Sequence, residues 1–284
     1  MRRLRTGGLI TAAILLIATG TAHGAVTVGQ LDPGGSDVTC GSSFDFLQPT
    51  VTSGNSYVMP YEGTVTSWAT RASATSDLHM TMKVFRGKGG ADYEVVGHAG
   101  PQTLQPSVVN TFSANIAVKA GDVLGVGVTD PTGPACLFPV TGDTYLYRYG
   151  FPSPGGMADG ESGTFTSFND RRLNVTAVLE PANTFSFGPV RRHRRKGTAN
   201  VTVNFPNPGR LTVSGNGVGG SAVKSGAGIP VPAAGSVAVA LRAKGRKRRT
   251  LNETGAVKVK AIMTFIPAGG APSQHSLKLK LLKQ

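Results

Sequence analysis

Short runs of alternating apolar and polar residues, rich in β-branched and aromatic side chains, dominate the chain after residue 24. Gly, Pro, Asn and Asp interrupt these runs about every eight to twelve residues, and apolar residues do not recur at helical spacing. In the run at 78–86, Leu78, Met80 and Met82 share one face. We expect that face to pack a core and the opposite face, with Lys83, to meet water. The pattern predicts an all-β protein.

Fourteen strands stand out, seven in each part of the chain. The first seven are expected at 63–72, 78–86, 93–99, 110–118, 123–129, 144–150 and 172–180. The second seven are expected at 184–190, 198–205, 210–216, 221–224, 236–242, 256–266 and 275–283. Connections such as KGGAD (88–92) look too long for tight hairpins, which favours a jelly-roll-like sandwich for the first set. The second set favours a smaller immunoglobulin-like sandwich without the Cys-Trp-Cys core signature.

The first 24 residues have the parts of a secretory signal peptide. Arg2, Arg3 and Arg5 precede an apolar run at 9–18, and mostly small residues follow as far as Gly24. The run is about half the length of a membrane-spanning helix, and no later apolar segment is longer, so no transmembrane segment is predicted. A general secretory signal is favoured over a twin-arginine motif. We expect an extracellular or cell-surface protein.

Charge divides the remaining chain into two predicted domains. Residues 25–180 hold 8 Lys and Arg against 14 Asp and Glu, a net charge of −6. Residues 181–284 hold 18 Lys and Arg against 1 Asp or Glu, a net charge of +17. The prediction is therefore an acidic jelly-roll-like sandwich at 25–180, followed by a basic immunoglobulin-like sandwich at 181–284.

Cys40 and Cys136 are the only cysteines. In an exported protein an isolated pair favours a disulfide over a metal or redox site, with two unpaired buried thiols as the alternative. On the chain-entropy model, closing so long a loop stabilises a fold by at most about 4 to 5 kcal/mol.

Several segments resemble a known type of protein. GTVTSW (63–68) and VKAGDVLGV (118–126) are similar to secreted β-sandwich proteins of actinobacteria. FSFGPV (185–190) and the run at 196–218 resemble the basic immunoglobulin-like domain that often ends them. The resemblance covers most of the chain after the signal peptide and consists of turn and strand patterns. It implies an extracellular or envelope setting, and it carries over neither an activity nor site residues.

Motifs for catalysis do not emerge. The chain has no GxSxG elbow, no HExxH and no Cys-His pairing beyond the disulfide. Its histidines after the signal peptide stand apart from one another, at His79, His98, His193 and His275. Aspartates in the Gly-rich loops at 32–37 and 159–161 are interpreted as turn residues rather than calcium ligands. We therefore predict a noncatalytic protein without metal or cofactor. A hydrolase of unrecognised type is the alternative, and it requires a cleft with two carboxylates near one substrate.

Tyr145, Tyr147 and Tyr149 alternate along one strand and share a face. Burial of that face in the core is favoured. An exposed row would instead stack on sugar rings and make the first domain a carbohydrate-binding module.

Two basic segments give the sharpest functional prediction. They are expected to be loops that meet at one pole of the immunoglobulin-like sandwich, and their cations are Arg191, Arg192, Arg194, Arg195, Lys196, Arg242, Lys244, Arg246, Lys247, Arg248 and Arg249. Such a field attracts polyanions. The aromatic residues of this domain all lie within strands, so an anionic cell-wall polymer or acidic polysaccharide is favoured over nucleic acid. Hairpin tips that only keep the domain in solution are the alternative. The expected function is a noncatalytic, envelope-associated binding or structural protein of unknown oligomeric state.

Overall fold

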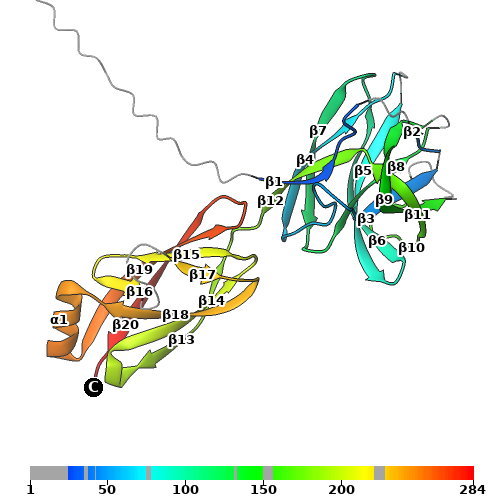
Figure 1. Cartoon of the computed structure of the whole chain (residues 1–284). Coiled ribbons are helices and arrows are strands. Elements are labelled where there is room, and N and C mark those ends of the chain that lie inside the picture. Colours follow the sequence, from blue (N-terminus) through cyan, green and yellow to red (C-terminus); the bar gives the residue numbers. More distant parts are fainter. Residues whose placement is uncertain are drawn as a thin grey trace, which may run out of the picture.

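The computed structural model describes residues 25–34, 38–41, 43–74, 78–130, 133–149, 156–220 and 228–284. The expected signal peptide and the strand expected at 221–224 lie outside these residues. The described chain forms two β-sandwiches, at 26–181 and 186–282, that lie end to end (Figure 1). The all-β prediction is confirmed.

The first sandwich consists of two antiparallel sheets of unequal size. The smaller sheet has four strands, in the spatial order β1 (Val26–Gln30), β12 (Val175–Pro181), β4 (Gly63–Arg71) and β7 (Val109–Val118). The larger has the order β10 (Ser162–Thr164), β6 (Asp92–Thr103), β5 (His79–Gly89), β8 (Val123–Val128), β3 (Phe44–Thr50), β9 (Ala135–Tyr149) and β11 (Thr166–Leu173), with β2 (Val38–Thr39) on β9. The chain crosses repeatedly between the sheets, as in a jelly roll.

The main core of this sandwich lies between its sheets and includes Trp68, Val84 and Leu173. A second, smaller cluster, with Phe85 and Val95, lies on the opposite face of the larger sheet under residues 156–165. The expectation that the Lys83 face meets water is therefore wrong. The sequence period shows that two faces alternate, but a distant segment decides whether the polar face is covered.

One turn also differs from its prediction. KGGAD (88–92) forms a tight hairpin in which Gly89 and Asp92 pair and only two residues separate them. Gly89 and Gly90 have φ angles of 118° and 59°. Glycine reaches this left-handed region without steric penalty, so the short turn closes.

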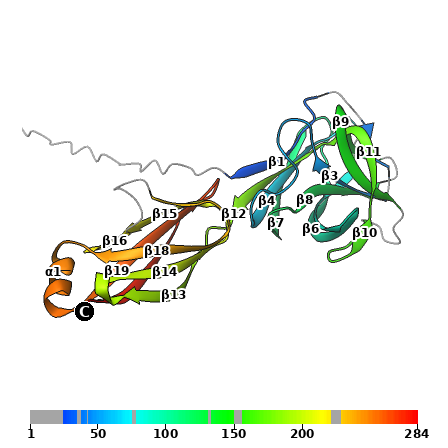
Figure 2. The same ribbon diagram turned by 60° about the horizontal axis from the view of Figure 1, so that its bottom comes forward.

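The second sandwich packs two four-stranded antiparallel sheets, seen from a second direction in Figure 2. One sheet has the order β13 (Ser186–His193), β14 (Thr198–Phe205), β18 (Gly235–Ala243) and β16 (Val218–Gly220). The other has the order β17 (Ile229–Val231), β15 (Gly209–Ser214), β19 (Ala256–Pro267) and β20 (Ser273–Leu282). The pairings β13-β14-β18 and β15-β19-β20 are those of an immunoglobulin-like sandwich. Its core shares no residue with that of the first sandwich.

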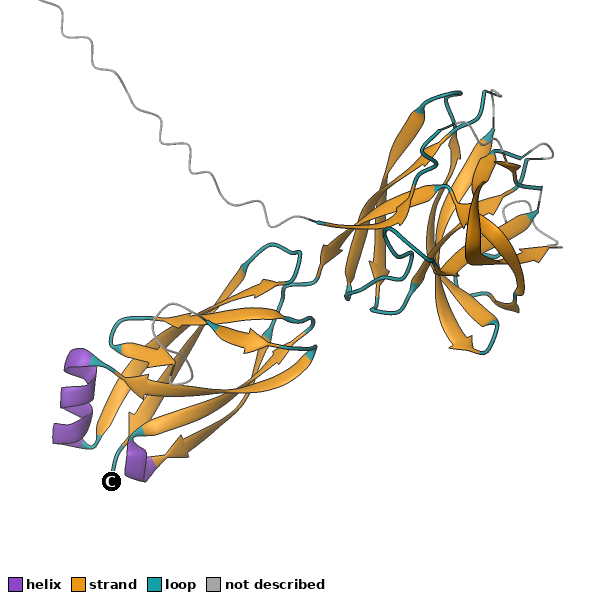
Figure 3. Cartoon of the chain, viewed as in Figure 1, coloured by secondary structure: helices purple, strands orange, loops and turns teal. Residues whose placement is uncertain are grey.

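Two helical segments replace the loops expected at the basic segments. The 3-10 helix η1 (Arg194–Lys196) and the α-helix α1 (Gly245–Thr254) lie at the end of the second sandwich away from the first (Figure 3). Arg, Lys and Leu favour helix, and Gly255 ends α1 with a φ of 71° while its N–H donates to the Leu251 carbonyl at 3.0 Å. Leu251 is the only buried residue of α1, so no helical period is visible in the sequence.

Asn207 links the two sandwiches. Its Oδ1 accepts a hydrogen bond from the Glu62 N–H at 3.0 Å, and its Nδ2 donates to the carbonyls of Glu62 and Ala182, each at 2.8 Å. The side chain is buried, so these bonds satisfy polar groups that would otherwise lack partners.

Candidate functional site

The two basic segments meet at one pole of the second sandwich, as the strand order predicts. Gly197, directly after η1, packs so closely on Leu251 of α1 that an added Cβ would lie 2.9 Å from its Cδ2. The chain end joins them, because the Gln284 N–H donates to the Arg194 carbonyl at 3.2 Å and Lys283 Nζ to Asn252 Oδ1 at 2.7 Å. We call the surface of residues 191–196 and 242–249 the basic pole.

Ten of the eleven predicted cations of the basic pole are exposed, and Lys247 is half-buried. Within the described residues none of them forms an ion pair with a carboxylate. Arg192 alone makes a side-chain hydrogen bond among these residues, from Nε to the Lys280 carbonyl at 3.0 Å. The positive charge of the pole therefore faces solvent without internal neutralisation.

The charges of α1 run against the helix dipole. Its first turn contains Arg246, Lys247 and Arg248 and no acidic residue, and no side chain caps its N-terminus. Glu253, the one carboxylate of residues 181–284, lies in the last turn. Cations near a helix N-terminus and anions near its C-terminus are each unfavourable by a few tenths of a kcal/mol to about 1 kcal/mol. An external anion at this pole would relieve the mismatch.

A groove of about 510 Å³ lies beside the pole and was missed by the sequence analysis. We call it the lysine groove; its polar lining residues are Asn216, Lys247, Lys258, Lys260, Lys278 and Lys280. Lys258 pairs directly across the strands with Lys280, and Lys260 with Lys278. The signal was present in the alternating VKVK (257–260) and LKLK (277–280), but only the register of β19 and β20 brings the two together.

The tyrosine row is buried at one end and exposed at the other. Tyr145 is 8% exposed and Tyr149 is 67% exposed, with Tyr147 between them. Burial raises the pKa of the Tyr145 hydroxyl. Phe44 packs against the exposed end, with its ring centroid 4.7 Å from that of Tyr149 and the two rings tilted, and Phe168 is 55% exposed. The row thus combines both expected arrangements, core at one end and open surface at the other.

A groove of about 330 Å³ runs along this row. We call it the aromatic groove; its rings belong to Phe44, Phe46, Tyr145, Tyr147 and Phe168, and Arg171 adds a cation. Flat apolar rings with a few polar groups are a usual lining for small-molecule and sugar sites.

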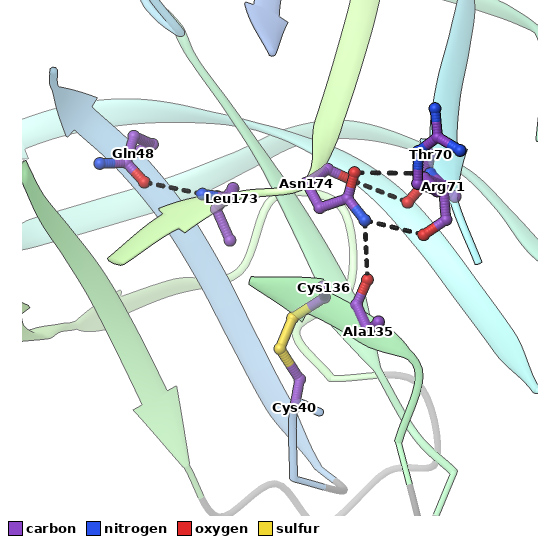
Figure 4. The surroundings of a disulfide bond; sticks show 8 residues. All are labelled: Cys40, Gln48, Thr70, Arg71, Ala135, Cys136, Leu173 and Asn174. Carbon is purple, nitrogen blue, oxygen red and sulfur yellow. Dashed lines mark hydrogen bonds between the residues drawn. A yellow bond between two sulfur atoms is a disulfide. The ribbon is translucent and has the colours of Figure 1, made fainter. Parts of the chain in front are cut away.

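The disulfide prediction is confirmed: Cys40 and Cys136 are bonded, with their Cα atoms 5.7 Å apart. Asn174 lies beside the disulfide and is buried (Figure 4). Its Nδ2 donates to the carbonyls of Arg71 at 2.7 Å and Ala135 at 3.0 Å. One amide therefore ties β4 and β9 to the junction between β11 and β12, beside the disulfide.

Charged groups inside the first sandwich serve its structure. Lys83 Nζ lies 2.7 Å from Asp45 Oδ1 and donates to the Met157 carbonyl at 2.8 Å, with both charged side chains buried. Burial raises the pKa of Asp45, and the Lys83 ammonium offsets part of that effect. Neither residue lines the lysine groove, the aromatic groove or two further surface cavities, one lined by residues 139–141 and 168–171 and one that includes Asp32 and Asn174.

The cavities named above hold no pair of carboxylates, and the described residues hold no group of metal ligands. His79 contacts Asp130, His98 Nδ1 lies 2.7 Å from Asp159 Oδ1, and among the described residues no three His, Cys, Asp or Glu side chains form a metal-binding group. Asp37, in one of the loops weighed for calcium, lies outside the described residues.

Comparisons with protein-family models, curated proteins and solved structures found no match to this chain. Among the described residues, no helix combines the length and apolar character needed to cross a membrane. The case for function therefore depends on the chemistry of the basic pole and the two grooves.

Proposed function

We propose that this is a noncatalytic exported protein whose second sandwich holds it to an anionic polymer of the cell envelope. The observation that carries the proposal is the basic pole, where eleven cations gather at the ends of β13 and β18 and in the segments that follow them, without a carboxylate partner among the described residues. Cations without internal partners attract a polyanion and release its counterions on contact.

Its position and composition support the same function. The pole lies at the end away from the acidic sandwich, so binding there would leave that sandwich pointing outward (Figure 1). The disulfide suits an oxidising compartment. The rings of Phe185, Phe205 and Phe265 are buried in the core, which favours wall polymer or acidic polysaccharide over single-stranded nucleic acid.

A binding assay with the whole protein tests this proposal. Purified cell wall, an acidic polysaccharide and duplex DNA are each titrated at about 50 and 200 mM salt. A variant carries Arg194→Gln, Arg195→Gln, Arg248→Gln and Arg249→Gln. We expect wall binding that weakens steeply with salt and is largely lost in the variant. Binding that is insensitive to both changes would reduce the basic pole to a solvated surface.

The aromatic groove supports a second candidate function, glycan binding by the first sandwich. Phe168 lines it with an exposed ring, and the exposed ring of Tyr149 contacts Phe44 of its lining, so a sugar can stack on both through its apolar face. Each ring is expected to contribute about 0.5 to 1.5 kcal/mol to binding. Tyr149→Ala and Phe168→Ala should therefore release the protein from insoluble polysaccharide. Val109→Ala, which removes an exposed apolar side chain from another strand, is the matched control.

A further inference from the structure

The lysine groove concentrates positive charge from three separate elements. Lys247 comes from α1, Lys258 and Lys260 from β19, and Lys278 and Lys280 from β20. None of the groove's lining residues is acidic. The four strand lysines are exposed, and none of the five forms an ion pair within the described residues.

The sheet gives these lysines an arrangement that folding alone does not favour. Lys258 faces Lys280 and Lys260 faces Lys278 in the strand register. Like charges directly opposite each other destabilise an antiparallel pair. An anion bound from outside would offset the repulsion within these two successive lysine pairs.

The same register fixes the distances between these lysines. The two lysines of a pair are about 5 Å apart at their Cα atoms. Successive pairs lie two residues apart, which is about 7 Å along an extended strand. The groove therefore offers two successive pairs of ammonium groups, and Lys247 of α1 adds a fifth to its lining.

The residue types indicate which anion fits. All five cations are lysines, whose ammonium groups bind phosphate as rotatable point charges, without the fixed bidentate geometry that arginine imposes. No lining residue is aromatic, so nucleic acid bases have no ring to stack on here.

We propose that the lysine groove binds an extended polymer of polyol or sugar units joined by phosphodiesters. One phosphate lies between Lys258 and Lys280 and the next between Lys260 and Lys278. This inference names the class of ligand for the proposed envelope binding, and it rests on that proposed function. The basic pole continues from the groove through Lys247 and takes further units of a longer chain.

A short probe separates the groove from the pole. The probe is a glycerol phosphate oligomer with a few phosphodiesters, titrated into the whole protein by calorimetry at low salt. Lys258→Gln with Lys280→Gln should weaken binding by about 25-fold, because each of the two cations near an anionic surface contributes a factor of about five. Lys258→Arg with Lys280→Arg keeps the charge and should stay within about threefold of the unchanged protein. Arg194→Gln with Arg195→Gln removes the same charge at the pole and should have little effect on this probe.

The outcomes distinguish the inference from the function it rests on. If the short probe binds the Gln groove variant as well as the unchanged protein, the groove assignment is overturned, whatever happens at the pole. If polygalacturonate or duplex DNA binds as tightly as the phosphodiester oligomer with the same dependence on Lys258 and Lys280, the ligand class is wrong. The envelope function itself fails only if purified wall binds the pole variant as tightly as it binds the unchanged protein. Thermal unfolding of each variant checks that a lost signal is not a lost fold.

Discussion

The two sandwiches differ in whether their charged side chains form ion pairs. In the first, cations and carboxylates meet inside the structure: Lys83 with Asp45, Arg172 with Asp143, and Arg86 with Asp122. In the second, the cations of the basic pole and the lysine groove form no ion pair within the described residues, and two lysine pairs face each other across neighbouring strands. Internal pairing makes a charge part of the fold, whereas an unpaired surface charge is available to a ligand.

The means of stabilisation differ in the same way. A disulfide and the buried amide of Asn174 bind distant strands of the first sandwich together. Both cysteines of the chain are used there, so the second sandwich relies on its apolar core and strand pairing. Charge substitutions are therefore expected to change stability in the first sandwich and ligand binding in the second.

The largest effect is expected from Lys83→Met. It leaves the Asp45 carboxylate buried without its cation, and breaking such a pair destabilises by about 3 to 5 kcal/mol. The sole tryptophan, Trp68, is buried in the first sandwich, so its fluorescence during urea denaturation follows this unit. Asp45→Asn combined with Lys83→Met should recover part of the loss. If Lys83→Met lowers the free energy of unfolding by less than about 1 kcal/mol, the ion pair does not stabilise the fold.

Removing the disulfide should have the next largest effect. Cys40→Ser with Cys136→Ser is expected to lower the free energy of unfolding of the first sandwich by about 2 to 4 kcal/mol, because the unfolded chain gains freedom. The unfolding transition of the second sandwich, followed by circular dichroism, should not move. An equal shift of both transitions would show that the two sandwiches unfold as one unit.

Asp143 is expected to make the first sandwich sensitive to acid. Burial raises the pKa of this carboxyl, but hydrogen bonds from Arg172 and Thr52 outweigh burial and leave the pKa below its usual value. Because the folded pKa is lowered, the stabilisation is present above the unfolded pKa of about 3.9 and is lost as the pH falls through the folded value. Asp143→Asn should lower the free energy of unfolding by about 1 to 3 kcal/mol at neutral pH. It should also reduce the further loss of stability as the pH falls. If denaturant titrations at acidic pH show the same loss of stability in the variant as in the unchanged protein, this assignment is wrong.

The smallest effect has the opposite sign. Lys258→Gln with Lys280→Gln removes a like-charged cross-strand pair, so the second sandwich should gain about 0.2 to 1 kcal/mol in the absence of ligand. The gain should shrink at high salt, because screening weakens the repulsion in the unchanged protein. A variant that gains stability while losing anion binding would separate ligand binding from folding. A loss of stability would place these lysines with the structural charges of the first sandwich.

Local patterns predicted much of this molecule because strand periodicity is itself local. Observed strands such as Thr198–Phe205 and Gly235–Ala243 nearly coincide with the predicted ones. α1 escaped prediction because its single buried residue, Leu251, gives no period. Lys83 was assigned to the wrong environment because a segment more than seventy residues away covers it. The lysine groove was missed because each strand alone shows only an ordinary alternation of apolar and charged residues.

By itself the sequence determined the fold class, the division of charge between the two halves and the use of the two cysteines, because composition and alternation are properties of neighbouring residues. Tertiary structure alone decided which charges meet. Strand register set Lys258 opposite Lys280, packing placed Asp45 beside Lys83, and the strand order brought η1 and α1 to one pole. Each of these contacts joins residues far apart in the chain, and it forms only when the strands pair and the sheets pack.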